Sequence, residues 1–338
     1  MSNLTQTAKH KWINLINSQA VKTFAYTWGI QFLNLPLISQ VYQSVYWPRI
    51  LRKSRNMPRT IVIEPYNVCN LACIMCPYPE MTRKKERMDL PLFKKIIDDA
   101  VDSGFKALSL SLYNEPFLDK TIFDKIKYAK ERGLEAAITS NGTILTDEMI
   151  KNTMESGVDC VTFSIDSLTK ENYEKIRVNA KFEETIQNVE RILEYRKRHN
   201  YKKPLIAMSA VRQLENDSSL DHLEELLKGL DLYAIAIKDN RKEGTPAYKH
   251  LNRSVYPCWW PWNQFIVYSN GKTGLCCMDY DNAHDIGDLN TQTIAEVWNS
   301  EKFTRMRELH LKGRGHEMEL CKDCDIPFRQ SPFFWWYL

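Results

Sequence analysis

The 338-residue sequence lacks the features that would assign it quickly to a broad class. Its net charge is only +4, from 46 Lys and Arg against 42 Asp and Glu, which is too small to indicate a nucleic-acid partner. No signal peptide is recognisable, because residues 1–11 are polar and no small-residue cleavage site follows an apolar core. We therefore expect a cytoplasmic protein whose cysteines are reduced rather than paired in disulfides.

The sequence also has no run of about twenty nearly uncharged apolar residues, which a membrane-spanning helix requires. The nearest stretch, residues 21–46, is interrupted by Lys22, by Pro36 and by four Asn or Gln residues. We interpret residues 1–56 as a helical amphipathic extension that packs on the body of the protein. The alternative is peripheral membrane contact, with basic residues near the end of this extension facing anionic lipid. The aromatic tail, 332–338, is expected to be buried or to dock on a partner or membrane.

Seven of the nine cysteines fall into two groups, and the spacing in both indicates metal ligation. In the first group, Cys69-x3-Cys73-x2-Cys76 follows a short apolar stretch and places three thiols within eight residues. A [4Fe–4S] cluster normally takes four cysteines, so this loop would leave one iron open to a small molecule. A zinc loop or a disulfide set is the alternative, although zinc sites prefer two close cysteine pairs.

The second cysteine group lies in the C-terminal third of the chain. Cys258 is followed after twelve residues by Gly271 and, after four more, by Cys276; Cys321 and Cys324 then form a C-x2-C pair. Four thiolates are enough to ligate every iron of one [4Fe–4S] cluster. A structural zinc site built from the same four cysteines is the alternative.

A β-hairpin is predicted over residues 265–277, with an Asn-Gly turn at 270–271. Neighbouring side chains of a strand point to opposite faces, so Cys276 and Cys277 cannot both face one cluster without distortion. The spacing from the glycine favours Cys276 as the ligand. We expect Cys277 and Cys160 to be packed thiols.

Residues 57–245 alternate short apolar runs with amphipathic stretches, which is typical of parallel βα units and of the α/β class. The expected strands lie near 60–65, 106–112, 135–140, 159–165, 204–211 and 232–238. The expected helices lie between them, at 92–103, 121–132, 147–156, 183–200 and 219–228. Six such units make a partial barrel, whose functional sites lie at the C-terminal ends of the strands. The first cysteine loop follows the first of these strands.

The C-x3-C-x2-C loop after a first strand resembles the signature of the radical S-adenosylmethionine (SAM) enzymes. The resemblance implies an open (β/α)6 TIM-like barrel and a [4Fe–4S] cluster whose open iron chelates SAM. The second cysteine group resembles the SPASM domain in its shortened twitch form, which implies a small C-terminal α+β domain with an auxiliary cluster. The cofactors implied are SAM and two [4Fe–4S] clusters. The expected domains are the extension 1–56, a radical SAM core 57–244, and an auxiliary domain with its tail 245–338.

Polar residues at several strand ends fit this resemblance. Glu115 and Pro116 stand in a motif similar to the family's Gly-Gly-Glu-Pro, which contacts the amino group of SAM, although Tyr113 and Asn114 replace the glycines. For these strand-end residues, local turn and helix-cap roles are the alternatives, and such a role is what we expect of Asp166. The expected SAM-binding residues are Met75, Glu115, Ser140, Asn141, Ser164 and Arg212.

Met75 stands where the family often has an aromatic residue, and it can still cover an adenine edge. The expected metal ligands are Cys69, Cys73, Cys76, Cys258, Cys276, Cys321 and Cys324.

The four-cysteine auxiliary set resembles that of radical SAM dehydrogenases of aminocyclitol sugars. It implies an oxidoreductase, or an epimerase, in which a 5′-deoxyadenosyl radical abstracts hydrogen from a hydroxyl-bearing substrate and the auxiliary cluster accepts an electron. The expected partners are a small-molecule or glycoconjugate substrate and an electron donor such as flavodoxin or ferredoxin. A maturase of ribosomal peptides is the second hypothesis, and a non-catalytic iron–sulfur protein is the third. No residue is identified as the catalytic base.

Overall fold

The structure, a computed structural model, describes residues 57–211, 231–236, 258, 260–322 and 324, together with positions 41 and 44. The predictions for the N-terminal extension, the helix near 219–228, Arg212 and the aromatic tail lie outside these described residues. So does the domain boundary expected after residue 244, which stays a prediction.

The chain forms two compact units, which are described separately. The larger unit comprises residues 56–244 and 259–308. The smaller unit comprises residues 1–55, 245–258 and 309–338. The larger unit holds the cysteine loop and the strand ends, and the smaller unit holds three of the four expected auxiliary ligands.

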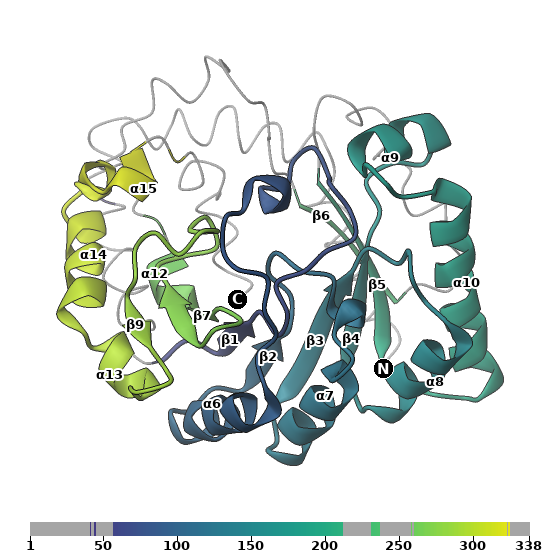
Figure 1. Ribbon diagram of the computed structural model, residues 1–338, viewed down its shortest axis with the longest axis horizontal. Coiled ribbons are helices and arrows are strands. Elements are labelled where there is room, and N and C mark those ends of the chain that lie inside the picture. The colour runs from purple at the N-terminus through teal and green to yellow at the C-terminus, as the bar shows by residue number, and fades with distance from the viewer. Residues whose placement is uncertain are drawn as a thin grey trace. The chain divides into compact units, whose positions relative to one another are not determined.

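The larger unit is built on a sheet that has nine strands in the described part of the chain, in the order β6-β5-β4-β3-β2-β1-β7-β8-β9 (Figure 1). The strands are β1 (Thr60–Ile63), β2 (Ala107–Ser109), β3 (Glu135–Ser140), β4 (Cys160–Ser164), β5 (Leu205–Val211), β6 (Leu232–Ala236), β7 (Gln264–Val267), β8 (Lys272–Gly274) and β9 (Gly287–Asp288). β1 to β6 pair in parallel and in sequence order, as in an open (β/α)6 barrel. The predicted α/β fold with a partial barrel is confirmed.

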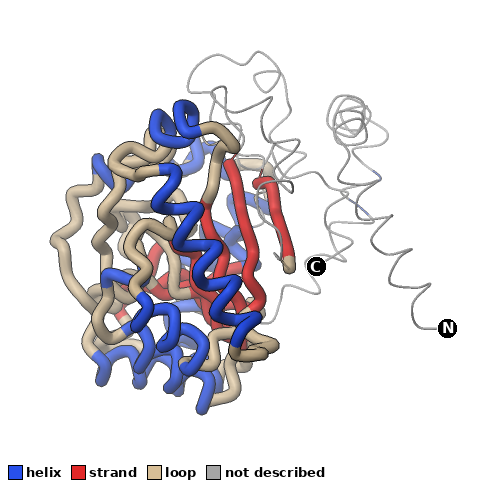
Figure 2. The backbone as a smooth tube through the Cα atoms, turned by 90° about the vertical axis from the view of Figure 1, so that its right-hand side faces the viewer, coloured by secondary structure: helices blue, strands red, loops and turns tan. Residues whose placement is uncertain are grey.

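Helices follow the strands, as the alternation predicts. The larger helices of the barrel are α6 (Leu90–Asp102), α7 (Ile122–Glu131), α8 (Asp147–Glu155), α9 (Lys170–Ile176) and α10 (Phe182–Arg198). Two single turns, η3 (Tyr78–Glu80) and η4 (Pro116–Leu118), lie in the loops after β1 and β2. Figure 1 shows α6, α7, α8 and α10 along the outer side of the strands, and Figure 2 shows the helices in front of the sheet. α9 was not predicted, because its seven residues are mostly charged and give little apolar periodicity.

The two faces of the parallel sheet carry side chains of different size. One face bears Ile138, Val161 and Phe163, which are fully buried and form part of the core. The other face bears the cross-strand partners Thr139 and Thr162, which are only half-buried. The same half-buried face also includes small residues on the neighbouring strands, namely Ser109, Ala137, Ser164 and Ser209. Solvent therefore reaches a face lined by short, partly polar side chains.

The predicted hairpin is present as β7 and β8, with Gly271 at a φ of +82° in the turn, a conformation that favours glycine. β8 ends at Gly274, so Cys276 and Cys277 lie in the turn after the strand. The strand alternation assumed for these two cysteines was therefore wrong. β7 also pairs in parallel with β1, which places the hairpin in the barrel sheet. Sequence alternation did not predict this pairing, because it joins segments about 200 residues apart.

The remaining elements are short. They are α12 (Trp260–Asn263), α13 (Ile294–Trp298), α14 (Glu301–Leu311), η6 (Gly315–Glu317) and α15 (Glu319–Lys322). α13 begins with a capping box, in which Thr293 and Glu296 each bond the backbone N–H of the other. Within the described residues, no helix combines the length and apolar character needed to cross a membrane.

Candidate active site

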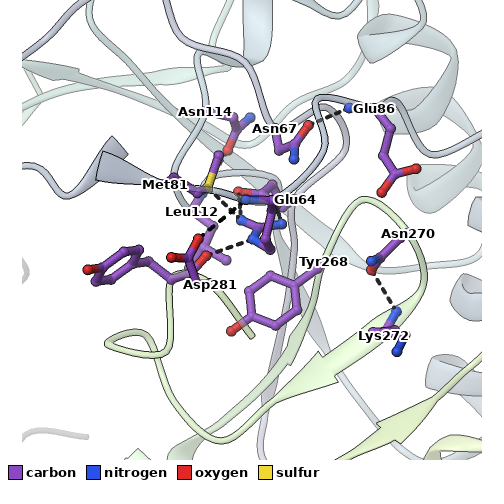
Figure 3. Close-up of polar contacts among 12 residues, drawn as sticks. Glu64, Asn67, Met81, Glu86, Leu112, Asn114, Tyr268, Asn270, Lys272 and Asp281 are labelled. Carbon is purple, nitrogen blue, oxygen red and sulfur yellow. Dashed lines mark hydrogen bonds and ion pairs between the residues drawn. The ribbon is translucent and has the colours of Figure 1, made fainter. Parts of the chain in front are cut away.

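The loop that carries the first three cysteines is closed at its base by Asn67. This fully buried side chain accepts the Glu86 N–H at 2.6 Å and donates to the Lys84 carbonyl at 2.7 Å (Figure 3). A second set of bonds runs to the C-terminal end of α9 and the residues after it, where the Ala72 and Ile74 N–H groups donate to backbone carbonyls at 3.1 and 3.0 Å. The loop is thus held from two sides while its thiols remain unpaired by disulfides.

The three thiols of the loop lie close enough to affect one another electrostatically. Burial, with a contribution from the nearby Glu115, Cys73 and Cys76, raises the pKa of Cys69 to about 11 against the opposing effect of a backbone hydrogen bond at Leu71. Burial also raises the pKa of Cys73. Cys69 and Cys73 therefore resist ionisation in this setting unless positive charge is supplied, as a bound metal would supply it.

A buried arginine that sequence analysis missed lies beside Cys73. Arg177 Nη1 is 3.8 Å from Cys73 Sγ, and its charge lowers the pKa of that thiol against the effect of burial. Arg177 Nε donates to the Asp166 carboxylate at 2.6 Å, and the same carboxylate accepts the Val211 N–H at 2.6 Å. Asp166 is therefore an ion-pair partner as well as a backbone acceptor, beyond the turn or cap role expected of it. The only sequence signal was an arginine eleven residues after a strand-end aspartate.

Glu115, after β2, is one of the buried carboxylates near the strand ends, at 1% exposed. Its Oε1 accepts from the Phe117 N–H at 3.1 Å and from Ser140 Oγ at 2.9 Å, and its Oε2 accepts from the Asn141 N–H at 2.7 Å. Burial raises its pKa to about 7, and these three donors counteract the rise. A carboxylate offers about four acceptor positions, so roughly one remains for a further donor. A cationic amine would fill that position and favour the ionised form.

Asn141 connects this carboxylate to the cysteine loop. Its side-chain Nδ2 donates to Asn70 Oδ1 at 2.8 Å and lies 3.9 Å from Cys69 Sγ. Asn70 in turn donates to Thr143 Oγ1 at 2.8 Å. The carboxyl ends of β2 and β3 therefore meet the loop through one continuous hydrogen-bond network, as expected for parallel strands that share an edge.

The structure thus brings together several of the expected SAM-binding residues. Ser140 and Asn141 both contact Glu115, and the Ser140 hydroxyl also accepts the Gly142 N–H at 3.0 Å. Ser164 ends β4 on the half-buried face, and Met75 is half-buried in the cysteine loop. Their roles in binding SAM stay predictions.

A second polar group lies where β1 ends, and Figure 3 shows Glu64 and Asp281 beside Tyr268. Arg83 donates to both oxygens of the buried Glu64, at 2.7 and 3.1 Å, and its guanidinium stacks 4.5 Å from the Tyr268 ring centroid. Arg83 Nε also donates to the Tyr280 carbonyl at 2.6 Å. This group fastens the loop after Cys76 to the turn after Cys276.

Tyr113, which stands at a glycine position of the family motif, makes a related connection. Its hydroxyl donates to the Cys277 carbonyl, and its ring meets that of Tyr280 edge-on at 6.2 Å. Burial raises its pKa well above the ordinary range of tyrosine, so the phenol stays protonated and can donate. The change from glycine thus adds a link between the end of β2 and the turn that holds Cys276 and Cys277.

Cys276 and Cys277 differ in their surroundings. The Met278 N–H points at Cys276 Sγ at 3.4 Å, an arrangement that favours a thiolate. The Cys277 side chain packs with Leu112 against the apolar cluster of Val62, Ile266 and Tyr268. The side chains of Cys276 and Cys277 therefore have different surroundings, as expected, but a turn and not strand alternation produces the difference.

The other three expected auxiliary ligands lie in the smaller unit. Cys258 is buried, while Cys321 and Cys324 are half-buried and share one turn through the bond from Cys324 N–H to the Cys321 carbonyl at 3.3 Å. A histidine that sequence analysis missed, His310, lies beside two of them. Burial lowers its pKa to about 4, so the ring is neutral.

The donor sets fit iron–sulfur clusters. A [4Fe–4S] cluster takes one thiolate on each ligated iron, so its ligands stand around it instead of meeting at one ion. Cys69, Cys73 and Cys76 would hold a cluster with one iron open, and Glu115 offers its free acceptor position nearby. Fold and site together define a barrel with a cysteine loop suited to a metal cluster near the C-terminal strand ends.

Comparison with known proteins gives the same class. Residues 63–227 match the Radical SAM superfamily, and residues 258–325 match SPASM, an iron–sulfur cluster-binding domain. A tungsten-containing aldehyde ferredoxin oxidoreductase cofactor-modifying protein of Pyrococcus furiosus is 24% identical over 319 residues, covering 79% of this chain and 87% of its own. A SAM-dependent 2-deoxy-scyllo-inosamine dehydrogenase of Niallia circulans is 23% identical over 269 residues, covering 78% and 92%.

Solved structures share the fold. BtrN in complex with AdoMet and 2-DOIA superposes with a TM-score of 0.55 at 19% identity, covering 82% of this chain and 97% of its own. Streptococcus suis SuiB bound to S-adenosylmethionine superposes with a TM-score of 0.62 at 14% identity, covering 92% and 84%. The chain belongs to the radical SAM superfamily and carries a C-terminal SPASM domain. It is a radical SAM enzyme, and its cofactors are SAM and [4Fe–4S] clusters.

Proposed function

We propose that this radical SAM enzyme oxidises a hydroxyl-bearing, sugar-like small molecule or glycoconjugate. The observation that carries the proposal is the division of seven cysteines into an incomplete set and a full set. The set of three leaves an iron open for SAM, and the set of four can ligate every iron of an auxiliary cluster. A fully ligated cluster has no free iron for substrate, which suits an electron acceptor. The likeness to 2-deoxy-scyllo-inosamine dehydrogenase over most of both chains supports the same reaction class.

When bound, SAM and its cluster supply a 5′-deoxyadenosyl radical that takes one hydrogen atom from the substrate carbon, while the hydroxyl proton passes to a base and the second electron to the auxiliary cluster. This chain's residues bind and orient the reactants. Glu115 receives the SAM amino group at its remaining acceptor position. Ser140 and Asn141 hold the Glu115 carboxylate in place. Arg177 offers positive charge beside Cys73 for the SAM carboxylate, with Asp166 fixing its direction.

The half-buried face of the sheet suits a polar small molecule. Its threonine and serine hydroxyls can both donate and accept hydrogen bonds, as sugar hydroxyls require. Ser164 and Ser209 are cross-strand partners on that face. They extend it toward the C-terminal ends of the strands, where Glu115 also lies. The first electron comes from a reduced partner such as flavodoxin or ferredoxin. For the N-terminal extension of this cytoplasmic enzyme, packing on the protein body is the favoured role and peripheral membrane contact is the alternative, and co-sedimentation with anionic vesicles at low and high salt distinguishes the two.

The test is isotope transfer from a substrate deuterated at the reacting carbon. Oxidation predicts deuterium in 5′-deoxyadenosine and one 5′-deoxyadenosine formed for each molecule of product. Replacement of the auxiliary cysteines should abolish product while SAM cleavage continues. Return of deuterium into SAM with catalytic turnover would instead indicate a redox-neutral change such as epimerisation. Label transfer from a peptide Cα or Cβ would reject the sugar substrate and favour a peptide maturase, which the likeness to SuiB leaves open.

A further inference from the structure

The smaller unit contains a buried histidine that touches two of the expected cluster ligands. His310 lies in the last turn of α14 and is 5% exposed. Its Nδ1 accepts the backbone N–H of Cys258 at 3.4 Å. Its Nε2 lies 3.6 Å from Cys321 Sγ. One ring thus bridges two cysteines that are 63 positions apart in the sequence.

The bond from Cys258 fixes which nitrogen of the ring carries the proton. A neutral imidazole has one donor and one acceptor, and a nitrogen that accepts an N–H cannot itself be protonated. Nδ1 is therefore the acceptor, and the proton resides on Nε2. The Nε2–H group points toward the sulfur of Cys321 at a distance compatible with an N–H···S hydrogen bond.

Gly315 leaves space for the His310 ring because it has no side chain. A Cβ atom added to Gly315 would stand 2.6 Å from both Cε1 and Nδ1 of His310, closer than such atoms approach in proteins. Gly315 begins the single turn η6, directly after the segment that joins it to α14. The absence of a side chain at 315 therefore lets the ring lie close to the backbone there, with Nε2 3.6 Å from Cys321 Sγ.

We propose that His310 is a positioning residue for the auxiliary cluster, holding the Cys258 backbone and donating an N–H···S hydrogen bond to Cys321. This inference rests on the proposed function, because it requires Cys258 and Cys321 to be cluster ligands. Reduction adds negative charge that spreads onto the ligating sulfurs, and a hydrogen bond to sulfur stabilises the reduced state. His310 thereby raises the reduction potential of the auxiliary cluster and makes it a better acceptor of the substrate electron.

The test measures the auxiliary cluster alone, in full-length protein whose loop ligands are replaced by alanine (C69A/C73A/C76A). In that background, His310→Phe keeps a ring but removes the donor, and His310→Gln keeps an N–H group at the same reach. An EPR-monitored redox titration should give a more negative potential for the Phe variant and a potential near that of the parent for the Gln variant. The iron content should stay at the parent level in both. Gly315→Ala should shift the potential in the same direction as His310→Phe.

Pulsed EPR gives a second readout that a purely structural role would not change. The parent should show one weakly coupled histidine nitrogen at the reduced cluster, and the Phe variant should lose it. An unchanged potential in a fully loaded Phe variant would overturn the inference. Loss of iron in both variants, or a strongly coupled nitrogen in the parent, would also overturn it, because His310 would then be a ligand. If the parent binds zinc instead of iron at these cysteines, the proposed function itself fails, whatever occupies position 310.

Discussion

The two cysteine groups of this enzyme have different surroundings. Around the loop of Cys69, Cys73 and Cys76 lie charged and strongly polar groups, with Arg177 at one thiol and the Glu115 network at another. The described contacts of the auxiliary cysteines include a neutral imidazole at Cys321 and the Met278 N–H at Cys276. A cluster with an open iron must recognise a charged cofactor, so its neighbours offer charges. A fully ligated cluster only exchanges electrons, so its neighbours need only adjust the charge on sulfur.

The same difference extends to how each group is held. The loop is fixed by a buried ion pair and a buried amide, Asp166 with Arg177 and Asn67 with two backbone groups. These groups are costly to bury unless each is paired, so the loop depends on their all being present. The turn with Cys276 is fixed by hydrogen bonds from Tyr113 and Arg83 to backbone carbonyls, and Arg83 also pairs with the buried Glu64. The Tyr113 contact is one neutral hydrogen bond, so its loss should have a smaller effect than loss of the Asp166–Arg177 ion pair.

The largest expected effect separates the two groups by iron content. Reconstituted protein should hold about eight iron atoms per chain, four for each cubane cluster. The variant C69A/C73A/C76A should retain about four and form no 5′-deoxyadenosine, because no open iron remains. The reciprocal variant without Cys258, Cys276, Cys321 and Cys324 should also retain about four but still cleave SAM. Iron analysis and chromatographic detection of 5′-deoxyadenosine provide the measurements. Equal loss of SAM cleavage in both variants would contradict the different roles assigned to the two cysteine groups.

The next effect concerns the ion pair behind the loop. Asp166→Ala leaves the Arg177 guanidinium buried without its carboxylate, and we expect the free energy of unfolding to fall by about 3–5 kcal/mol. Chemical denaturation of anaerobic protein measures the change. The matched control is Lys170→Ala, which removes an exposed ion pair to Glu183 and should change stability far less. Similar losses in both variants would show that the loop does not depend on this pair.

Glu115 gives a smaller effect, visible in SAM binding. Glu115→Gln keeps the shape but removes the charge, and a charge-assisted hydrogen bond of about 1.5–3 kcal/mol corresponds to roughly 10- to 150-fold weaker SAM binding. Iron content should remain unchanged. Equilibrium binding at fixed pH provides the measurement, and Ser140→Ala, which removes only one supporting donor, should weaken SAM less. Wild-type affinity in the Gln variant would exclude Glu115 from the SAM site.

The pH dependence of Glu115 sharpens this test. Burial raises its pKa from the ordinary 4.5 to about 7, so the folded protein holds a proton that the unfolded chain releases between these values. The contribution of this group to stability is therefore present below about pH 4.5 and is lost as the pH rises through about 7. SAM needs the ionised carboxylate, so its affinity should increase from pH 6 to 7.5. In Glu115→Gln, stability and SAM affinity should both depend less on pH. Thermal unfolding and SAM titration at several pH values measure the two effects.

The smallest effect belongs to the turn after β8. Tyr113→Phe keeps the edge-on contact with Tyr280 but leaves the Cys277 carbonyl without its hydroxyl partner. We expect a loss of about 1 kcal/mol in the free energy of unfolding, the net value of one hydrogen bond. SAM binding should be unchanged. A large loss of auxiliary iron in this variant would show that the turn depends on Tyr113 as strongly as the loop depends on Asp166.

Much of the fold was predictable because parallel βα units leave a simple pattern. The strands around Ile61, Leu108 and Ile138 are short apolar runs, and all were placed within two or three residues of their observed bounds. The pairing of β7 with β1 was not predictable, since no local pattern encodes a contact across 200 residues. The length of β8 was also missed, because the strand was continued through Gly274 to Cys277, although Gly274 ends it.

For the site, sequence identified the residues whose spacing is local and missed those whose role depends on three-dimensional packing. The cysteine loop and Glu115 follow strands directly, so a motif records them. Arg177 reaches Cys73 only because the segment after α9 pairs with the loop backbone. His310 reaches Cys321 from the end of a helix with weak amphipathic character. Neither position carries a signal that distinguishes it from the other arginines and histidines of the chain.

The most direct test of the division between the two cysteine groups is the response of each reduced cluster to SAM, read by EPR. In the variant that lacks the auxiliary ligands, SAM should change the spectrum, because it binds the open iron of the loop cluster. In C69A/C73A/C76A, the spectrum of the auxiliary cluster should be the same with and without SAM. A SAM-dependent change in the second variant, or none in the first, would contradict the account.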